Sequence, residues 1–423
     1  MPPDTTRQTR VLILTERYWP ELSGCGPVMH NIAKILRDAG YSVTVLTTRP
    51  HFPERRVWPD YAKGQNDRQT VDGIAIHRVP FFPFRRGGFL DRLATESLMA
   101  LAFWWRLRQQ PFQGFDTVLA MCPSTLTVLV GNTANAGRRI ALVHDIQSGL
   151  AAGLKIGPAK LAMGLMRGLE RLAFNRTHHC IVLTNAMQRA LTGNGVTAPI
   201  AVMPPFVDVS HIKPLPLADD HRNTVVYSGN FGRKQGLEQV LDAASILQDQ
   251  RPEIRFVLRG DGSQKPALEA RARALQLRNL TFAPFVPESA FNQALADAAV
   301  HLMPQRAEGA AFAIPSKLFM ILAAGRPVVC TAGEGSPLFD LASTVDAVAC
   351  VPCDQPNKLA AKIVELVEAA ELGAAEGGRP TVPTVSASRE ALVGLVRQVT
   401  KPERQPAVSV GTVLQPDLRR PTP

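Results

Sequence analysis

The sequence predicts an α/β protein with two doubly wound parallel sheets that face each other across a central cleft. Short apolar runs alternate with helix-length amphipathic stretches along most of the chain, which is the pattern of repeated βαβ units. The alternation starts twice, at Val11 and at Thr224, and the proline-rich stretch Pro204–Pro216 lies between the two series. A length of 423 residues also exceeds one ordinary core and suits two domains.

The first series opens with a βαβ unit. Val11–Thr15 is a short apolar run of the buried-strand type, and the loop Glu16–Pro27 follows it. Val28–Ala39 has helical spacing and ends at a glycine, and Tyr41–Thr47 is the next strand. We expect further strands at Ile74–Val79, Thr117–Ala120, Ile140–His144, Cys180–Thr184 and Ala201–Met203, and a helix at Leu90–Arg108.

The second series continues the same alternation. We expect strands at Thr224–Ser228, Arg255–Leu258, Leu280–Phe282, Val300–Met303 and Pro327–Cys330, and helices at Leu237–Gln248, Lys265–Ala274, Glu288–Asp297, Lys317–Ala324 and Pro356–Glu368. Leu372–Val382 is rich in Gly, Ala and Pro and is predicted to be a loop, whereas Ser386–Val399 regains a helical pattern. The tail, residues 401–423, is proline-rich with few large apolar residues and is predicted to be disordered.

The composition excludes several classes of protein. Apolar residues make up 45% and charged residues 20% of the chain, as in globular proteins. We find no apolar run of about 18 residues and no apolar segment before Val11, so we expect neither a transmembrane helix nor a signal peptide, and a cytoplasmic location. The six cysteines are scattered, which argues against a disulfide framework. Cys350 and Cys353 have redox-motif spacing, but ordinary strand-end cysteines are the favoured interpretation.

Positive charge is concentrated in the first half of the chain. Residues 1–210 carry 24 Lys and Arg against 14 Asp and Glu, whereas the rest carries 23 against 22. The stretch at 81–108 combines five arginines with clustered Phe and Trp. Such a composition suits contact with an anionic membrane surface, although a buried helix with arginines at its ends has it too. Nucleic acid is the less favoured partner, because we find no nucleic-acid module.

One strand-to-helix turn of the second series, from Ser228 to Gly236, is a candidate phosphate site. A second glycine-bearing turn, Gly260-Asp261-Gly262, follows the strand at Arg255–Leu258. Glycines let the backbone approach a phosphate closely, and a helix N-terminus offers free N–H groups. The alternative is a plain turn whose basic residues are solvated, and glycine spacing by itself is weak support for a site.

Lys317 is a further candidate. Pro315 suits the start of a helix and Ser316 suits its N-cap. Lys317 is then in the first helical turn, where a cation is unfavourable against the helix dipole. A bound anion would explain that placement, and a tolerated surface lysine is an equally weighted alternative.

In the first series, candidate residues follow the strands at their carboxyl ends, where open α/β sheets bind ligands. His144 can donate to a hydroxyl or a phosphate, and Asp145 can orient it, although a structural histidine is the alternative. The loop after the first strand contains Gly24 and Gly26, which allow a close approach to a ligand. A merely flexible loop is the other interpretation.

Four segments together resemble a known family: YWPELSGCGP at 18–27, YSGNFGRKQGLE at 227–238, RGDGSQKPALE at 259–269 and PQRAEGAAFAIPSKLFMILAAGRPVV at 304–329. Their order and spacing resemble those of GT-B glycosyltransferases of family 4. The likeness extends from Val11 to about Val399, and the chain is most similar to the colanic-acid fucosyltransferase type of exopolysaccharide gene clusters.

The resemblance implies two Rossmann-like domains, an acceptor-binding one at 1–210 and a nucleotide-sugar-binding one at 211–383, with a helix at 384–400 that returns to the first domain. It implies a retaining, metal-independent transferase without a cofactor. The implied donor is a nucleotide-sugar, GDP-fucose by likeness alone, and the acceptor a polyprenyl-diphosphate-linked oligosaccharide at the inner face of the plasma membrane. We assign catalysis to His144, Asp145 and Lys317, and donor binding to Gly24, Gly26, Ser228, Gly229, Asn230, Arg233, Lys234, Gln235, Gly260, Gly262, Glu308, Pro315, Ser316 and Met320.

The chain departs from the family at two glutamate positions. The family places two glutamates eight positions apart, where this chain has Phe312 and Met320, and Glu308 lies near the first at a different offset. The departure motivates a second hypothesis, a catalytically inactive scaffold of a polysaccharide biosynthesis complex. A third hypothesis is a GT-B nucleotide-sugar epimerase, which the basic aromatic stretch disfavours.

The chain also departs from the family in the diphosphate turn. The family's Arg and Lys align with Asn230 and Gln235. Arg233, Lys234 and Lys317 are the available replacements, and Lys317 is our first choice.

Overall fold

The computed structural model describes residues 8–21, 25–51, 56–81, 89–122, 124–146, 148, 159–203, 209, 212–306, 315, 317–343, 345–371 and 385–400. Five predictions lie outside these residues: Gly24, Glu308, Ser316, the loop at Leu372–Val382 and the tail at 401–423.

The chain divides into two compact units. The strands of the first unit are β1 (Arg10–Leu14), β2 (Ser42–Thr48), β3 (Arg68–Val71), β4 (Ile74–Val79), β5 (Phe115–Cys122), β6 (Ala136–Val143), β7 (His179–Val182) and β8 (Ile200–Val202). Its helices are α1 (Gly26–Asp38), α2 (Phe89–Leu107), α3 (Thr125–Gly131), α5 (Ala159–Asn175), α6 (Asn185–Gly193) and α14 (Val385–Thr400).

The second unit has a smaller sheet. Its strands are β9 (Thr224–Ser228), β10 (Arg255–Arg259), β11 (Leu280–Ala283), β12 (Val300–Met303), β13 (Val328–Thr331) and β14 (Val348–Val351). Its helices are α7 (Glu238–Gln250), α8 (Lys265–Ala274), α9 (Phe291–Ala296), α11 (Lys317–Ala323), α12 (Pro337–Ala342) and α13 (Pro356–Glu371).

Both sheets are doubly wound. Their strand orders are β3-β4-β2-β1-β5-β6-β7-β8 and β11-β10-β9-β12-β13-β14, and among the described strands only the β3–β4 pair is antiparallel. The order reverses between β1 and β5 in the first sheet and between β9 and β12 in the second. Ligands bind beside such switch points at the carboxyl ends of the strands, so we expect a site in the loops there.

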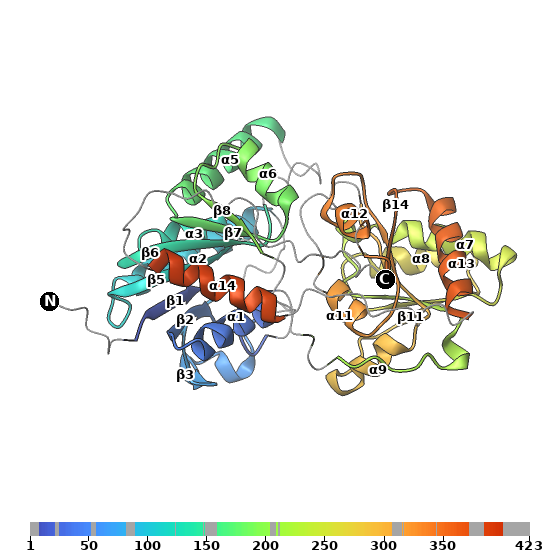
Figure 1. Ribbon diagram of the computed structural model, residues 1–423, viewed down its shortest axis with the longest axis horizontal. Helices are drawn as coiled ribbons and strands as arrows, with labels where there is room; N and C mark the ends of the chain where they lie inside the picture. Colours follow the sequence, from blue (N-terminus) through green and yellow to red (C-terminus); the bar gives the residue numbers. More distant parts are fainter. Residues whose placement is uncertain are drawn as a thin grey trace, which may run out of the picture. The chain divides into compact units, whose positions relative to one another are not determined.

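The last described helix, α14, completes the core of the first unit. Leu392 and Val396 are buried together with Ile13 of β1 and Ile32 of α1. Burying one such side chain stabilises the fold by about 1.5–3 kcal/mol. Figure 1 shows α14, drawn in red, beside the blue helix α1, so the two ends of the described chain meet in one core.

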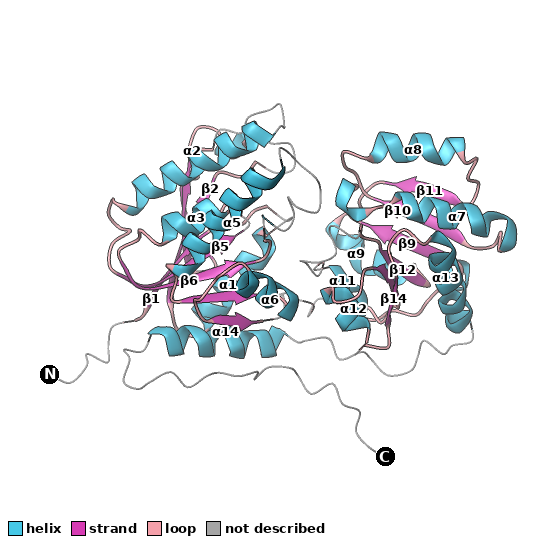
Figure 2. Ribbon diagram, turned by 90° about the horizontal axis from the view of Figure 1, so that it is seen from above, coloured by secondary structure: helices cyan, strands magenta, loops and turns pink. Residues whose placement is uncertain are grey.

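Helices cover both faces of the second sheet, as Figure 2 shows. One face packs against α7, α8 and α13 through a cluster that includes Val240, Leu268 and Ile363. The other face packs against α9, α11 and α12 through Leu295 and Leu318. Helix α11 follows β12 in the chain and starts at the carboxyl edge of the sheet. Its apolar side packs in the core.

The predicted strands and helices are present with ends shifted by a few residues, but the prediction for one helix was wrong. We expected a single helix at Glu288–Asp297, but Glu288–Ala290 is a 3-10 turn and α9 covers only Phe291–Ala296. The N–H of Ala290 donates to the carbonyl of Pro287 at 3.0 Å, and this i to i+3 bond tightens the first turn. None of the described helices is long and apolar enough to cross a bilayer.

Candidate active site

Two strand ends of the second unit approach each other closely, at Gly229 after β9 and at Gly260 after β10. The N–H of Gly229 donates to the carbonyl of Arg259 at 2.9 Å. A Cβ atom on Gly260 would lie 1.9 Å from the carbonyl oxygen of Gly229, and the φ angle of Gly260 is +147°. A Cβ atom on Gly262 would likewise lie 2.6 Å from the carbonyl oxygen of Phe231. Only glycine fits at these two positions. Close packing of the backbone therefore requires Gly260 and Gly262, apart from the donor-binding role that we predicted for them from the sequence.

Lys317, at the start of α11, reaches the same strand end. Its Nζ donates to the carbonyl of Ser228 at 3.0 Å and lies 4.1 Å from the centre of the Tyr227 ring. Burial lowers the pKa of Lys317 to about 7, and no charged group of the described chain opposes that shift. Among the described residues, the partners of this ammonium are a carbonyl and an aromatic face, which compensate its charge incompletely. It can therefore bind an anion that arrives at this edge.

The exposed side of the turn carries Arg233 and Lys234. Both are exposed residues of a 3-10 turn, Arg233–Gln235, that ends at Gly236 with a φ angle of +57°. The carbonyl of Lys234 accepts the N–H of Arg306 at 3.0 Å, and the Arg306 guanidinium pairs with Glu238 at 2.8 Å. The turn is thus tied to the segment after β12, and its two cations remain free to contact solvent or a ligand.

Two uncharged amides of this turn lie beside Gly232. A Cβ atom on Gly232 would lie 2.8 Å from Nδ2 of Asn230 and 2.7 Å from Oε1 of Gln235. The structure therefore brings Asn230 and Gln235 together, and their donor-binding role stays a prediction. Pro315 precedes α11 and accepts the N–H of Leu318 at 3.0 Å.

Met320 has a different environment from the one expected of a donor ligand. It is half-buried and packs against the apolar cluster beneath α11. Its neighbours in that cluster include Leu318 and Ile321. The side chain therefore contributes to the core.

In the first unit, His144 follows β6 at the carboxyl edge of the sheet. Its N–H donates to the carbonyl of Cys122 at 3.1 Å, and the carbonyl of Asp145 accepts from the Cys122 thiol at 3.5 Å. The Nε2 atom of His144 is buried and has no hydrogen-bond partner among the described residues. Burial lowers the pKa of His144 to about 4, so the imidazole is neutral near pH 7. A neutral ring can donate to or accept from one substrate group.

The carboxylates of Glu170, which is buried, and Glu96, which is half-buried, contact residues that follow β6 and β5. Glu170 of α5 accepts from the N–H and the hydroxyl of Ser148, at 2.9 and 2.5 Å. Glu96 of α2 accepts from the hydroxyl of Ser124 at 3.2 Å, just after β5. These contacts join Ser124 and Ser148 to helices α2 and α5.

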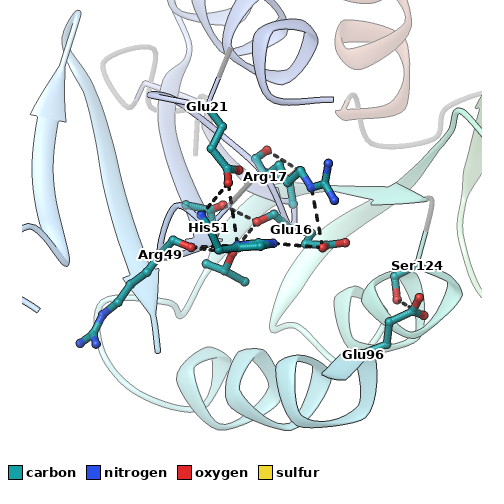
Figure 3. Close-up of polar contacts among 10 residues, drawn as sticks. Glu16, Arg17, Glu21, Arg49, His51, Glu96 and Ser124 are labelled. Carbon is teal, nitrogen blue, oxygen red and sulfur yellow. Dashed lines mark hydrogen bonds and ion pairs between the residues drawn. The ribbon is translucent and has the colours of Figure 1, made fainter. Parts of the chain in front are cut away.

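Figure 3 shows a polar cluster that we did not predict from the sequence, formed by Glu16, Glu21 and His51 at the ends of β1 and β2. The N–H of His51 donates to Oε1 of Glu21 at 2.7 Å, and its Nε2 lies 3.7 Å from Oε1 of Glu16. The His51 ring stacks on Phe81 with ring centres 3.8 Å apart. Glu21 and His51 are buried, whereas 21% of the Glu16 side chain is exposed, so Glu16 is the member that can meet a ligand.

The sequence positions of these residues indicate how the cluster could have been predicted. Glu16 directly follows the first predicted strand, and His51 lies a few residues beyond the second. Gly26 packs against the same loop, because a Cβ atom there would lie 2.5 Å from the carbonyl oxygen of Glu21. Among the described residues, no group of three or more His, Cys, Asp or Glu side chains is placed to hold a metal ion.

Two family models match the chain in the order of its two units. Residues 23–205 match a glycosyl transferase 4-like domain, and residues 222–369 match the glycosyl transferases of group 1. The chain belongs to the family 4 glycosyltransferases of the GT-B type. The sequence-based identification of the family and of its two Rossmann-like sheets is confirmed.

This glycosyltransferase has a relative of similar length in Escherichia coli (strain K12). That relative, named as colanic acid biosynthesis glycosyl transferase WcaI, is 26% identical over 380 residues, which cover 85% of this chain and 92% of the relative. Among solved structures, the sucrose-phosphate synthase of Thermosynechococcus elongatus is 15% identical with a TM-score of 0.65, over 93% of this glycosyltransferase and 96% of the synthase. Anabaena HepE, solved with UDP and glucose, is 15% identical with a TM-score of 0.60, over 93% and 97%.

Proposed function

We propose that this glycosyltransferase moves a sugar from a nucleotide-sugar to a polyprenyl-diphosphate-linked oligosaccharide in exopolysaccharide assembly, with retention of the anomeric configuration. GDP-fucose is the first donor to test. The likeness to the colanic acid relative supports a role in exopolysaccharide assembly, and a neighbour solved with UDP and glucose supports a nucleotide-sugar donor. The observation that carries the proposal is the incompletely compensated ammonium of Lys317 beside Ser228 and Gly229.

In the proposed reaction, the donor diphosphate occupies the edge formed by the ends of β9 and β10. The Lys317 ammonium stabilises the negative charge that develops on the diphosphate as the bond to the sugar breaks. The acceptor hydroxyl then attacks from the face that the diphosphate leaves, and its proton passes to the departing phosphate. Neutral His144 holds a substrate hydroxyl, and Asp145 orients it. No metal or cofactor takes part in this proposal.

One experiment tests the proposal against its alternatives. The purified protein is incubated with a lipid-linked acceptor extracted from membranes and with a panel of GDP- and UDP-sugars. We expect release of the nucleoside diphosphate together with a lengthened lipid-linked glycan. No turnover with any donor supports the inactive scaffold instead. Interconversion of two nucleotide-sugars without an acceptor supports the epimerase.

We also propose that the first unit docks on the inner face of the plasma membrane through α2. Leu101 and Trp105 are one turn apart on this helix, and 59% and 62% of their surfaces are exposed. The guanidinium of Arg108 lies 3.4 Å from the centre of the neighbouring Trp104 ring. Apolar side chains flanked by arginines match the interface of an anionic bilayer. Part of the predicted stretch, residues 82–88, lies outside the described residues.

The docking proposal predicts a loss of vesicle binding in the Leu101→Ser, Trp105→Ser double variant. We expect partitioning onto vesicles that contain phosphatidylglycerol to fall by about tenfold to a hundredfold, because two apolar side chains no longer leave water. Sedimentation with the vesicles measures it. Phe285→Ser is the matched control, since Phe285 is 57% exposed in the second unit. Equal losses in the two variants would count against docking through α2.

A further inference from the structure

Arg259, at the end of β10, is a cation that we did not single out from the sequence. It is the last residue of β10, directly before Gly260, and its register partner on β9 is Ser228. The carbonyl of Ser228 is the group to which Lys317 donates. Register partners on parallel strands project to the same face of a sheet. Two cations therefore border the same pair of strand ends.

The guanidinium of Arg259 lies on the face that α9 and α11 cover, the pair visible together in Figure 2. Its Nη1 donates to the carbonyl of Ala294 on α9 at 3.4 Å, which is long for a hydrogen bond. Lys317 starts α11 on this same face. Both cations are therefore on the same face of the sheet, where they can contact the same ligand.

The charges around Arg259 leave it incompletely compensated. Burial lowers the pKa of Arg259, and the nearest acidic influence is Asp297. The Asp297 carboxylate accepts from Nε2 of Gln293 at 2.7 Å and lies 3.8 Å from Nε2 of His221, while no carboxylate of the described chain forms an ion pair with Arg259. Since a guanidinium has five N–H donors, most of its donors remain available.

The other cation of this face has its own partners. Arg326 donates to the carbonyls of Ala296 and Leu215, at 2.8–3.2 Å. Burial lowers the pKa of His301 to about 4, and Arg326, Arg259 and Lys317 add to that shift. Arg326 is thus a structural cation, whereas Arg259 and Lys317 are the two with capacity for a ligand.

We propose that Arg259 binds the diphosphate of the nucleotide-sugar together with Lys317. The inference rests on the proposed function, because it places a second cation at the same donor site. Asn230 and Gln235 in the neighbouring turn are uncharged. In this proposal Arg259 and Lys317 supply positive charge at the ends of β9 and β10. The planar guanidinium bridges two phosphate oxygens, and the ammonium acts as a point charge.

The test measures the binding of UDP, GDP and inorganic pyrophosphate, with uridine and guanosine as phosphate-free probes, by calorimetry on the full chain. We expect Arg259→Gln to raise the Kd of pyrophosphate, and of whichever nucleoside diphosphate binds, by about tenfold to a hundredfold. This is the effect of losing charge-assisted hydrogen bonds. The nucleosides should bind Arg259→Gln as they bind the wild type. Arg259→Lys keeps the charge and should recover part of the lost affinity.

The matched control is Arg255→Gln. Arg255 is the exposed first residue of the same strand, at the opposite end from the site, and its guanidinium contacts the carbonyl of Asp220. Three results overturn the inference: a diphosphate loss in Arg259→Gln no larger than in Arg255→Gln, an equal loss for the nucleosides, or no recovery in Arg259→Lys. If Lys317→Met loses diphosphate affinity while Arg259→Gln does not, the donor site stands and only the role of Arg259 fails. Failure of the wild type to bind any diphosphate overturns both.

Discussion

Replacing Lys317 with methionine is expected to lower kcat/KM by about a hundredfold to a thousandfold, the cost of removing one group that stabilises developing charge. Methionine keeps the unbranched stem and removes only the ammonium that donates to Ser228. Steady-state kinetics with the active donor measure the effect, and Lys358→Met, at an exposed position of α13, is the control. A Lys317→Met variant with unchanged kcat/KM would remove the basis of the proposed donor site.

The pH dependence of donor binding provides an independent test of Lys317. Its pKa of about 7 means that the ammonium is charged below pH 7 and loses its proton above it. A bound diphosphate favours the charged form and raises that pKa. Above pH 7 the protein must therefore take up a proton to bind, and the donor KM should rise by up to about tenfold per pH unit. The Lys317→Met variant should lose this dependence.

Lys317 is expected to destabilise the folded protein, although it favours donor binding. Its pKa falls from 10.5 in the unfolded chain to about 7 in the folded protein, so the folded state binds the proton less well. The resulting destabilisation is complete below pH 7, shrinks as the pH rises, and is gone above the unfolded pKa. Lys317→Met is therefore expected to raise the melting temperature at pH 7 in the absence of ligand. A lower melting temperature would identify Lys317 as a structural residue.

The sequence predicted the architecture well because apolar runs and helical spacing are local properties. Short elements were harder. The residues of α3, Thr125–Gly131, are β-branched or apolar almost throughout, so they have no helical stripe that distinguishes the element from a strand. Tertiary packing of this helix against α2 and α5 decides its conformation. The missing signal was long-range, and a single sequence does not contain it.

The site was predictable in its location and less so in its composition. Lys317 was found because a cation in a first helical turn conflicts with the dipole. Arg259 was not predicted, because the predicted strand ended one residue earlier, at Leu258. We assigned the donor-binding role in this turn to the glycines that follow, Gly260 and Gly262. The Glu16 and His51 pair joins loops that are 35 positions apart, so only the parallel pairing of β1 with β2 brings them together. Met320, a position inferred from a family contact, is half-buried and packs against the apolar cluster of α11, and its donor-binding role stays a prediction.

Gly260→Ala is expected to lower the free energy of unfolding of the second unit by about 2–5 kcal/mol, from backbone strain together with a steric clash. The new Cβ atom would lie 1.9 Å from the carbonyl oxygen of Gly229, and the φ angle of +147° is unfavourable for alanine. Relief of the clash has to move Gly229 away from β10. That movement displaces the end of β9, to which Lys317 donates, so donor binding should be lost as well.

Gly335→Ala separates the two contributions. Gly335 also has a positive φ angle, +74°, but no atom lies within 4 Å of a Cβ atom placed there. This variant therefore carries only the conformational cost of a left-handed residue, about 1–2 kcal/mol. Urea unfolding monitored by circular dichroism, together with calorimetric titration of UDP and GDP, compares the two variants. Equal destabilisation would show that the ends of β9 and β10 can separate freely, and the donor site would then not depend on their close approach.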